Sequence, residues 1–150
     1  MGEVGILIVG HLTLAEDLIT TTKFLIGDLF GVKVRGLSIN PKEKGDKLCK
    51  MVTDAIKDID EGEGVLILTD MLGGTPTNIC FPYIEKGKVE LITGVNLPMV
   101  ISSITNQKRK TLSELSESVR NSGKESICIV NEQVKGNFKD GNSKGSITRI

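Results

Sequence analysis

The chain has 150 residues, of which 39% are hydrophobic, and its 19 basic and 19 acidic residues give a formal net charge of zero. This length suits one compact domain with a substantial hydrophobic core. The balanced charge and an aromatic content of only 3% argue against binding of nucleic acid or of an anionic membrane surface.

The first predicted strand and helix come from an apolar run and the stretch that follows it. Residues 4–9 form a continuous apolar run, ended by a glycine, which is typical of a parallel strand buried on both faces. Thr13 and Glu16 have the spacing of a capping box and predict a helix. Gly27 interrupts this helix and Gly31 follows its end. Four leucines are expected along one side of it: Leu14, Leu18, Leu25 and Leu29.

A second strand is predicted at residues 32–39, with a second helix after it. Asn40 and Pro41 are suited to be the N-cap and the first helical residue, and Glu43 completes a capping box. This helix has the clearest helical periodicity of apolar residues in the chain. They are Leu48, Met51, Val52, Ala55, Ile56 and Ile59.

The alternation of strands and helices continues to residue 130. Three further apolar runs have the length of short strands: 65–68, 89–92 and 126–130. Helices are predicted from Thr75 and Pro76, from Leu97 and from Thr111, where Glu114 completes another capping box. This order of elements predicts an α/β domain with a mainly parallel sheet.

The end of the chain differs in composition. Residues 131–150 are rich in Gly, Asn, Ser and Lys, so we interpret residues 1–130 as one domain and 131–150 as a flexible polar extension. The three cysteines are odd in number and widely spaced, which predicts free thiols in a reducing compartment. The amino-terminal residues lack the features of a signal peptide, and no apolar run approaches the roughly 20 residues that span a bilayer. We therefore expect a soluble, cytoplasmic protein.

Two polar side chains follow strands that we expect to be neighbours. In open parallel sheets, ligands bind outside the carboxyl ends of the strands, where the strand order reverses. His11, the only histidine, follows the first strand, and Asp70 follows the third. In the common order 2-1-3-4 the two side chains can meet. The carboxylate would fix the tautomer of the imidazole and leave its other nitrogen as a nucleophile, as a phosphoryl acceptor requires.

The loop after Asp70 has the composition of an anion-binding segment. Gly73 and Gly74 permit a close backbone approach, and Thr75 is suited to be the N-cap of the next helix. Free N–H groups at such a helix start attract anions, and the Thr75 hydroxyl would be a further donor. We interpret His11, Asp70 and Thr75 as candidate catalytic residues, and Gly73, Gly74 and Thr75 as candidate phosphate-binding residues.

Other classes of site lack their motifs. No Gly-Lys-Ser/Thr follows the glycines, which excludes a Walker loop, and no dinucleotide fingerprint surrounds Gly10. One histidine without paired cysteines argues against a zinc site, and no nucleophile elbow marks a serine hydrolase. We therefore expect neither a metal nor a cofactor.

Three features of the chain match one known family. They are His11, the segment 68–78 (Leu-Thr-Asp-Met-Leu-Gly-Gly-Thr-Pro-Thr-Asn) and the segment 94–99 (Gly-Val-Asn-Leu-Pro-Met). Over about residues 4–130 the chain resembles the IIA component of the mannose/fructose/sorbose class of the bacterial phosphoenolpyruvate-dependent sugar phosphotransferase system. The family commonly has Ser or Thr before the histidine and Gly after it, where this chain has Gly10 and Leu12.

The resemblance implies a role for each matching residue. His11 would receive a phosphoryl group from phospho-HPr and donate it to a IIB component, and the membrane IIC and IID components would be served indirectly. Asp70 would orient the imidazole, Thr75 would contact the ring or the phosphoryl group, and Asn96 would have a supporting role. The implied fold is a three-layer α/β sandwich with a C-terminal antiparallel strand, residues 126–130, exchanged between the subunits of a homodimer.

Three alternative functions stay open on the sequence. The same fold could be a regulatory module that senses phosphorylation, or the phosphocarrier that serves dihydroxyacetone kinase. It could also be a flavodoxin-like module that binds a small phosphate-bearing ligand at the same strand ends.

Overall fold

In the computed structural model, which describes residues 2–29 and 31–133, four parallel strands form one sheet. They are β1 (Gly5–His11), β2 (Val34–Ile39), β3 (Val65–Thr69) and β4 (Val89–Thr93). Their order is β2-β1-β3-β4, which confirms the predicted order and makes β1 and β3 neighbours. β1 extends further than predicted, through Gly10 and His11, because both residues still pair with β2.

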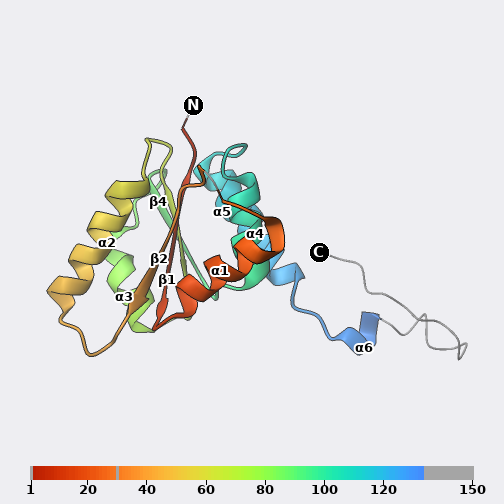
Figure 1. Cartoon of the computed structure of the whole chain (residues 1–150), viewed down its shortest axis with the longest axis horizontal. Helices are drawn as coiled ribbons and strands as arrows, with labels where there is room; N and C mark the ends of the chain where they lie inside the picture. Colours follow the sequence, from red (N-terminus) through yellow and green to blue (C-terminus); the bar gives the residue numbers. More distant parts are fainter. Residues whose placement is uncertain (1, 30, 134–150) are drawn as a thin grey trace, which may run out of the picture.

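Helices cover both faces of the sheet (Figure 1). One face carries α2 (Gly45–Ile59) and α3 (Thr75–Cys80). The other face carries α1 (Leu14–Ile26), α4 (Leu97–Asn106) and α5 (Leu112–Glu125). Two short segments, η1 (Phe81–Tyr83) and α6 (Val130–Gln133), come after α3 and α5. Within these described ranges no helix is both long and apolar enough to cross a membrane.

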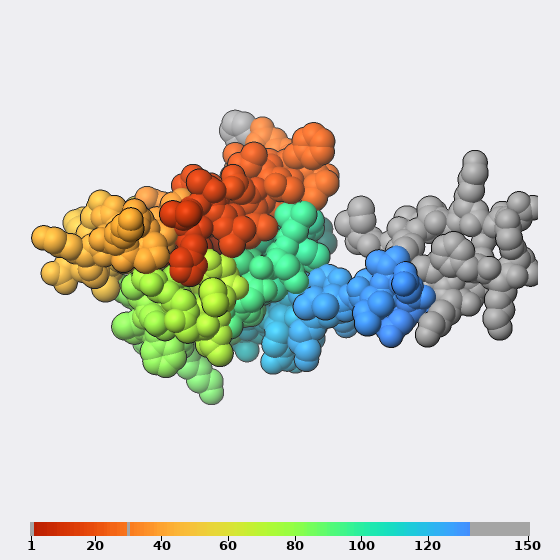
Figure 2. Space-filling model, turned by 90° about the horizontal axis from the view of Figure 1, so that it is seen from below, coloured from red at the N-terminus to blue at the C-terminus, as the bar shows by residue number. Residues whose placement is uncertain are grey.

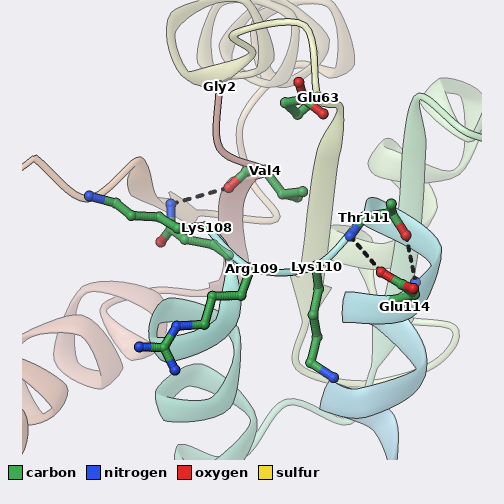
Figure 3. A pocket seen from close by; sticks show the side chains of 9 residues that line it. Gly2, Val4, Glu63, Lys108, Arg109, Lys110, Thr111 and Glu114 are labelled. Atoms are coloured by element: carbon green, nitrogen blue, oxygen red, sulfur yellow. Dashed lines mark hydrogen bonds between the residues drawn. The ribbon is translucent and has the colours of Figure 1, made fainter.

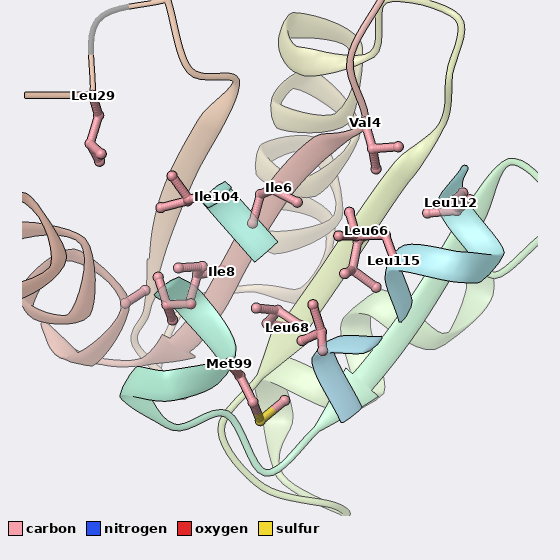
Figure 4. Packing of buried hydrophobic residues seen from close by; sticks show 13 residues of the cluster. Val4, Ile6, Ile8, Leu29, Leu66, Leu68, Met99, Ile104, Leu112 and Leu115 are labelled. Carbon is pink, nitrogen blue, oxygen red and sulfur yellow. The ribbon is translucent and has the colours of Figure 1, made fainter. Parts of the chain in front are cut away.

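Each central strand contributes to two hydrophobic cores, because successive side chains of a strand point to opposite faces. Ile6 and Ile8 of β1 pack on the side of α1, α4 and α5, whereas Leu7 and Val9 pack on the side of α2. Figure 4 shows the first of these cores, with Leu66 of β3 facing the helices. All five side chains are fully buried, as expected for a parallel strand covered on both faces.

The capping box predicted at the start of α1 does not form. Thr13 is the N-cap residue, but its side chain makes no capping hydrogen bond, because its backbone (φ −86°, ψ −2°) is helical and not extended. The predicted apolar side is confirmed only in part. Leu18 packs against the core and Leu29, beyond the end of α1, is buried, whereas Leu14 and Leu25 are exposed and Ala15 is buried. α1 approaches β2 closely at Gly36, where an added methyl group would lie 3.4 Å from the carbonyl carbon of Ala15. The small Ala15 side chain belongs to the core on this side of the sheet.

The predicted start of α2 at Asn40 and Pro41 is also wrong. α2 begins at Gly45, after Lys44 as N-cap residue. The side-chain oxygen of Asn40 accepts a hydrogen bond from the backbone N–H of Lys42 at 3.0 Å, so this segment forms a local turn instead of a helix start. The predicted apolar periodicity of α2 is confirmed by its buried residues, Leu48, Val52, Ala55 and Ile59.

At the start of α5 the predicted capping box is present. The side chain of Thr111 accepts from the N–H of Glu114, and the carboxylate of Glu114 accepts from the N–H of Thr111. Thr111 has the extended backbone (φ −64°, ψ 163°) that such a cap requires.

The predicted strand at 126–130 does not join the sheet of the single chain. Ser126 is the C-cap residue of α5, and α6 begins at Val130. A strand needs a second strand to bond its N–H and C=O groups, and Figure 1 shows the chain after α5 leading away from the sheet. Ile127 is consequently 79% exposed. The remainder of the predicted extension, residues 134–150, lies outside the described residues.

Candidate active site

His11 and Asp70 are in direct contact, as their positions at two strand ends predict. Nδ1 of the His11 ring lies 2.7 Å from Oδ2 of Asp70, and the backbone N–H of His11 donates to the same oxygen at 2.9 Å. Two hydrogen bonds between the same two residues fix the ring relative to the carboxylate. Figure 2 looks onto this edge of the sheet, where red atoms of the β1–α1 junction adjoin yellow-green atoms of the loop after β3.

The register of the sheet explains the contact. Val9 of β1 is paired with Thr69, the last residue of β3, so Asp70 comes next to the last two residues of β1, Gly10 and His11. β3 ends at Thr69, and Asp70 comes next. The backbone N–H of Met71 donates to Oδ1 of Asp70 at 2.9 Å, so both carboxylate oxygens accept hydrogen bonds.

The carboxylate determines which ring nitrogen carries a proton. Asp70 has only 10% of its side chain exposed. Burial alone would raise the pKa of Asp70, but hydrogen bonds from the His11 N–H, the His11 ring and the Met71 N–H outweigh it and hold that pKa below its usual range. An ionised carboxylate only accepts hydrogen bonds, so Nδ1 of His11 must be the donor. In the neutral ring the lone pair therefore lies on Nε2, and the His11 side chain is 34% exposed.

Gly74 lies beside the His11 ring, where a side chain would crowd its neighbours. A methyl group at Gly74 would lie 3.0 Å from Cε1 of His11 and 3.1 Å from Cγ of Met71, both tight contacts. Gly73 has φ +79°, a conformation that favours glycine. Thr75 is not the predicted N-cap, because the extended residue before α3 is Gly74 and Thr75 is the first helical residue. Among the hydrogen bonds of the described residues, none joins Thr75 to His11.

The sequence matches a known protein family over most of its length. A family model described as the PTS system fructose IIA component, EIIA-man, matches residues 5–120. The chain belongs to the EIIA-man family. It is therefore a phosphocarrier component of a sugar phosphotransferase system, and the flavodoxin-like alternative is not favoured.

Three relatives show how far this likeness extends. The chain is 27% identical to the PTS system fructose-specific EIIA component of Bacillus subtilis, over 88% of the chain and 90% of that protein. It is 30% identical to the mannose-specific EIIAB component of Escherichia coli K12, over 67% of the chain but only 31% of that longer protein. The solved mannose/sorbose-specific IIA subunit of Enterococcus faecalis has the same fold, with a TM-score of 0.75 at 19% identity over 85% of this chain and 94% of that one.

In this member of the EIIA-man family the residue after the histidine is strained. Leu12 has φ +49° and is the only non-glycine residue with positive φ in the part of the chain that the structure describes. This conformation costs a residue with a Cβ about 1–2 kcal/mol. Because 63% of Leu12 is exposed, packing within the chain does not offset that cost. The same φ explains physically why glycine suits this position.

Leu12→Gly is expected to raise the free energy of unfolding by about 0.5–1 kcal/mol. The relieved strain of about 1–2 kcal/mol exceeds the added entropy of a glycine in the unfolded chain, about 0.5–1 kcal/mol. Urea unfolding of both proteins measures the difference. Leu72→Gly is the matched control, because Leu72 is a similarly exposed leucine of the neighbouring loop without positive φ. Equal destabilisation by both substitutions would contradict the strain at Leu12.

Two residues of the EIIA-man site escaped the sequence analysis. Thr69 and Thr77 both lie in the segment 68–78 that matches the family, but nothing in the sequence distinguishes their side chains from those of neighbouring residues. In the structure their hydroxyls lie 2.8 Å apart directly beneath the loop that contains Asp70. Asn96, expected to support the site, instead caps α4 by accepting the N–H of Met99 at 3.1 Å.

The His11 side chain is partly exposed, at 34%. A cavity of about 160 Å³ is lined by residues that include Val4 and Glu63, whose side chains are drawn in Figure 3. Val4 precedes the start of β1, whereas His11 is its last residue, so this cavity lies at the opposite end of the sheet. Within the described residues, no group of three His, Cys, Asp or Glu side chains could hold a metal ion.

Proposed function

We propose that Nε2 of His11 accepts a phosphoryl group from phospho-HPr and passes it to a IIB component, and so serves the membrane IIC and IID components that take up sugar. The observation that carries this proposal is the 2.7 Å hydrogen bond between Nδ1 and Asp70. It leaves Nε2 as the one ring nitrogen with a free lone pair, and a free lone pair is what a phosphoryl acceptor needs.

Each transfer exchanges one nitrogen–phosphorus bond for another. The lone pair of Nε2 forms a bond to phosphorus while the bond to the donor's histidine breaks in line with it. The ring of His11 then carries a proton on Nδ1 and the phosphoryl group on Nε2, and so gains a positive charge. The Asp70 carboxylate stabilises that charge. Transfer to the IIB component reverses the step and returns the electron pair to Nε2.

We assign phosphate binding to Gly73, Gly74 and Thr75. Gly74 is packed against Cε1, the ring carbon between the two nitrogens, so the backbone of this loop lies next to the position of a group on Nε2. Backbone N–H groups of a glycine-rich segment can approach an anion closely. The hydroxyl of Thr75, at the start of α3, would add a neutral donor.

Exposed apolar side chains near His11 support a protein partner. Leu12 follows His11 directly, and Met71 and Leu72 follow Asp70 in the adjacent loop. All three are more than half exposed. Large apolar side chains around a polar centre are typical of surfaces that bind another protein. Another phosphocarrier could cover them while its own histidine reaches His11.

Incubation with phosphoenolpyruvate, enzyme I and HPr is the direct test of the proposed function. We expect one phosphoryl group per chain, followed by its loss when a IIB component is added. A chain that stays unlabelled while HPr in the same reaction is labelled would exclude the transfer from HPr.

We also propose that residues 126–130 pair with a second copy of the chain in a homodimer. β4 is an edge strand, and along it lies a cavity of about 560 Å³ lined by β4 and α5. The hydroxyl of Thr93 is buried there and has no hydrogen-bond partner among residues 2–29 and 31–133. The exposed residues Ile127 and Ile129 have the alternation of a strand and would fill such an edge.

Sedimentation equilibrium of the full chain tests the proposed dimer. We expect a dimer for the unmodified chain and a monomer for Ile129→Asp, because a carboxylate in the exchanged strand would be buried against the partner. Phe24→Asp is the control, because Phe24 of α1 is also a large exposed apolar residue, and this variant should remain dimeric. A monomeric unmodified chain would contradict strand exchange.

A further inference from the structure

A short chain of buried hydrogen bonds connects α3 to the loop that contains Asp70. The hydroxyl oxygen of Thr77 lies 2.6 Å from the backbone carbonyl of Met71 and 2.8 Å from the hydroxyl of Thr69. Thr69 is fully buried and Thr77 is 4% exposed. A carbonyl only accepts, so Thr77 uses its one proton on Met71. The hydroxyl of Thr69 must then donate to Thr77, and the direction of both bonds is fixed.

Met71 is the point where this chain of bonds reaches the site. Its carbonyl is held by Thr77, and its N–H donates to Oδ1 of Asp70 at 2.9 Å. The Met71 carbonyl also accepts from the backbone N–H of Gly74, but at 3.4 Å this hydrogen bond is much weaker. The hydroxyl of Thr77 is therefore the main group that holds the middle of the loop. The other oxygen of Asp70 accepts both bonds from His11.

Thr69 anchors the lower end of the same chain. Its backbone carbonyl accepts the N–H of Val95 at 2.9 Å, which connects β3 to the loop after β4. Two hydroxyls buried among apolar side chains are costly unless each finds a partner. Here each is satisfied by the other or by the Met71 carbonyl. Valine has nearly the same shape as threonine, so replacing Thr77 by valine would keep its packing and remove only its hydrogen bonds.

We propose that Thr77 is a positioning residue for His11, because its buried hydroxyl holds Met71 and through it the Asp70 carboxylate that orients the imidazole. The proposal rests on the proposed function of His11. Loss of the hydroxyl frees the loop beneath Asp70, so the carboxylate no longer holds Nδ1 of His11 in one geometry. The ring then populates both tautomers, and one of them presents a protonated Nε2 that cannot accept a phosphoryl group. A small misplacement of reacting groups is enough to slow such a transfer.

The test compares Thr77→Val, which removes the hydroxyl and keeps the shape, with Thr77→Ser, which keeps the hydroxyl. The first readout is the rate of phosphoryl transfer from phospho-HPr. The second is the ¹⁵N spectrum of the imidazole in histidine-labelled protein without a tag, which reports His11 alone because the chain has one histidine. The matched control is Thr22→Val, which removes another fully buried threonine hydroxyl, one that donates to Leu18 within α1.

We expect Thr77→Val to transfer about tenfold more slowly or worse, and to show ring nitrogens shifted toward a mixture of tautomers. Thr77→Ser should restore both readouts to within about twofold, and Thr22→Val should leave both unchanged. A folded Thr77→Val protein with the normal rate and spectrum would overturn the proposal. Failure of Thr77→Ser to restore them would overturn it too, since the hydroxyl would not be the cause.

Two further comparisons keep the test decisive. If Thr77→Val does not fold, Thr77→Ala and Thr77→Ser differ by the hydroxyl alone, and equal transfer rates in these two would reject the positioning role. If the unmodified chain accepts no phosphoryl group from phospho-HPr, the proposed function fails. The imidazole spectrum still tests the positioning of the ring by Thr77, because it needs no partner protein.

Discussion

His11→Ala is expected to abolish labelling of the chain by phosphoenolpyruvate, enzyme I and HPr. The chain has no second histidine to take over the role. The substitution should leave the fold intact, because His11 ends β1 and its side chain is one-third exposed. Asp70 also keeps two partners, since the backbone N–H groups of residue 11 and of Met71 persist in the variant. The mass of the intact protein before and after incubation measures the result.

The exposed thiols provide the control for this experiment. Cys49 and Cys128 are exposed thiols, whereas Cys80 is buried and burial raises the pKa of its thiol to about 12. Cys49→Ser and Cys128→Ser should therefore be labelled like the unmodified chain. Undiminished labelling of His11→Ala would mean that another residue is the acceptor.

Asp70→Asn should produce the second-largest effect, a fall of about a hundredfold or more in the rate of phosphoryl transfer from phospho-HPr. Asparagine has one acceptor oxygen, whereas the Asp70 carboxylate accepts from His11 on one oxygen and from Met71 on the other. The variant therefore loses control of the His11 tautomer. It also loses the negative charge that stabilises a phosphorylated ring. Rapid-quench measurement of the transfer gives the rate.

The same variant changes how stability depends on pH. The folded protein lowers the pKa of Asp70, so the ionised carboxylate adds stability above its unfolded pKa of about 3.9. This stability is lost as the pH falls through the lower folded pKa. Asp70→Asn has no such group, so the difference in unfolding free energy between the two proteins should shrink as pH falls below about 4. A difference that stays constant with pH, measured by urea unfolding, would contradict the assigned hydrogen bonds.

The contact of His11 with Asp70 could be predicted because it depends on features that sequence patterns carry well. Continuous apolar runs identify parallel strands, and the common strand order then makes β1 and β3 neighbours. Residues after neighbouring strands meet at one edge, so no knowledge of side-chain packing is needed to place His11 beside Asp70.

Helix starts are harder to predict, because the same capping motif can occur with an extended or a helical N-cap residue. Thr111 with Glu114 forms the expected capping box on an extended residue. Thr13 with Glu16 does not, because Thr13 follows the left-handed Leu12 in a tight turn and is already helical. The conformation of the preceding residue decides the outcome, and a spacing rule does not contain it.

The hydroxyl pair beneath the loop could not be predicted for a different reason. Thr69 ends β3 and Thr77 lies in the first turn of α3, and in the sequence each looks like an ordinary polar residue of its own element. Their role in holding the loop depends on a hydrogen bond of 2.8 Å between their hydroxyls, which forms only when β3 and α3 pack together. The proposed exchange of residues 126–130 likewise depends on a second chain.

The most direct test of the central claim is to identify which nitrogen of His11 carries the phosphoryl group. Phosphorylated protein labelled with ¹⁵N-histidine can be examined by ³¹P and ¹⁵N NMR, and the single imidazole makes the assignment unambiguous. We predict phosphorus bonded to Nε2, with a proton retained on Nδ1 and hydrogen-bonded to Asp70. Phosphorus on Nδ1, or on any residue other than His11, would contradict the account.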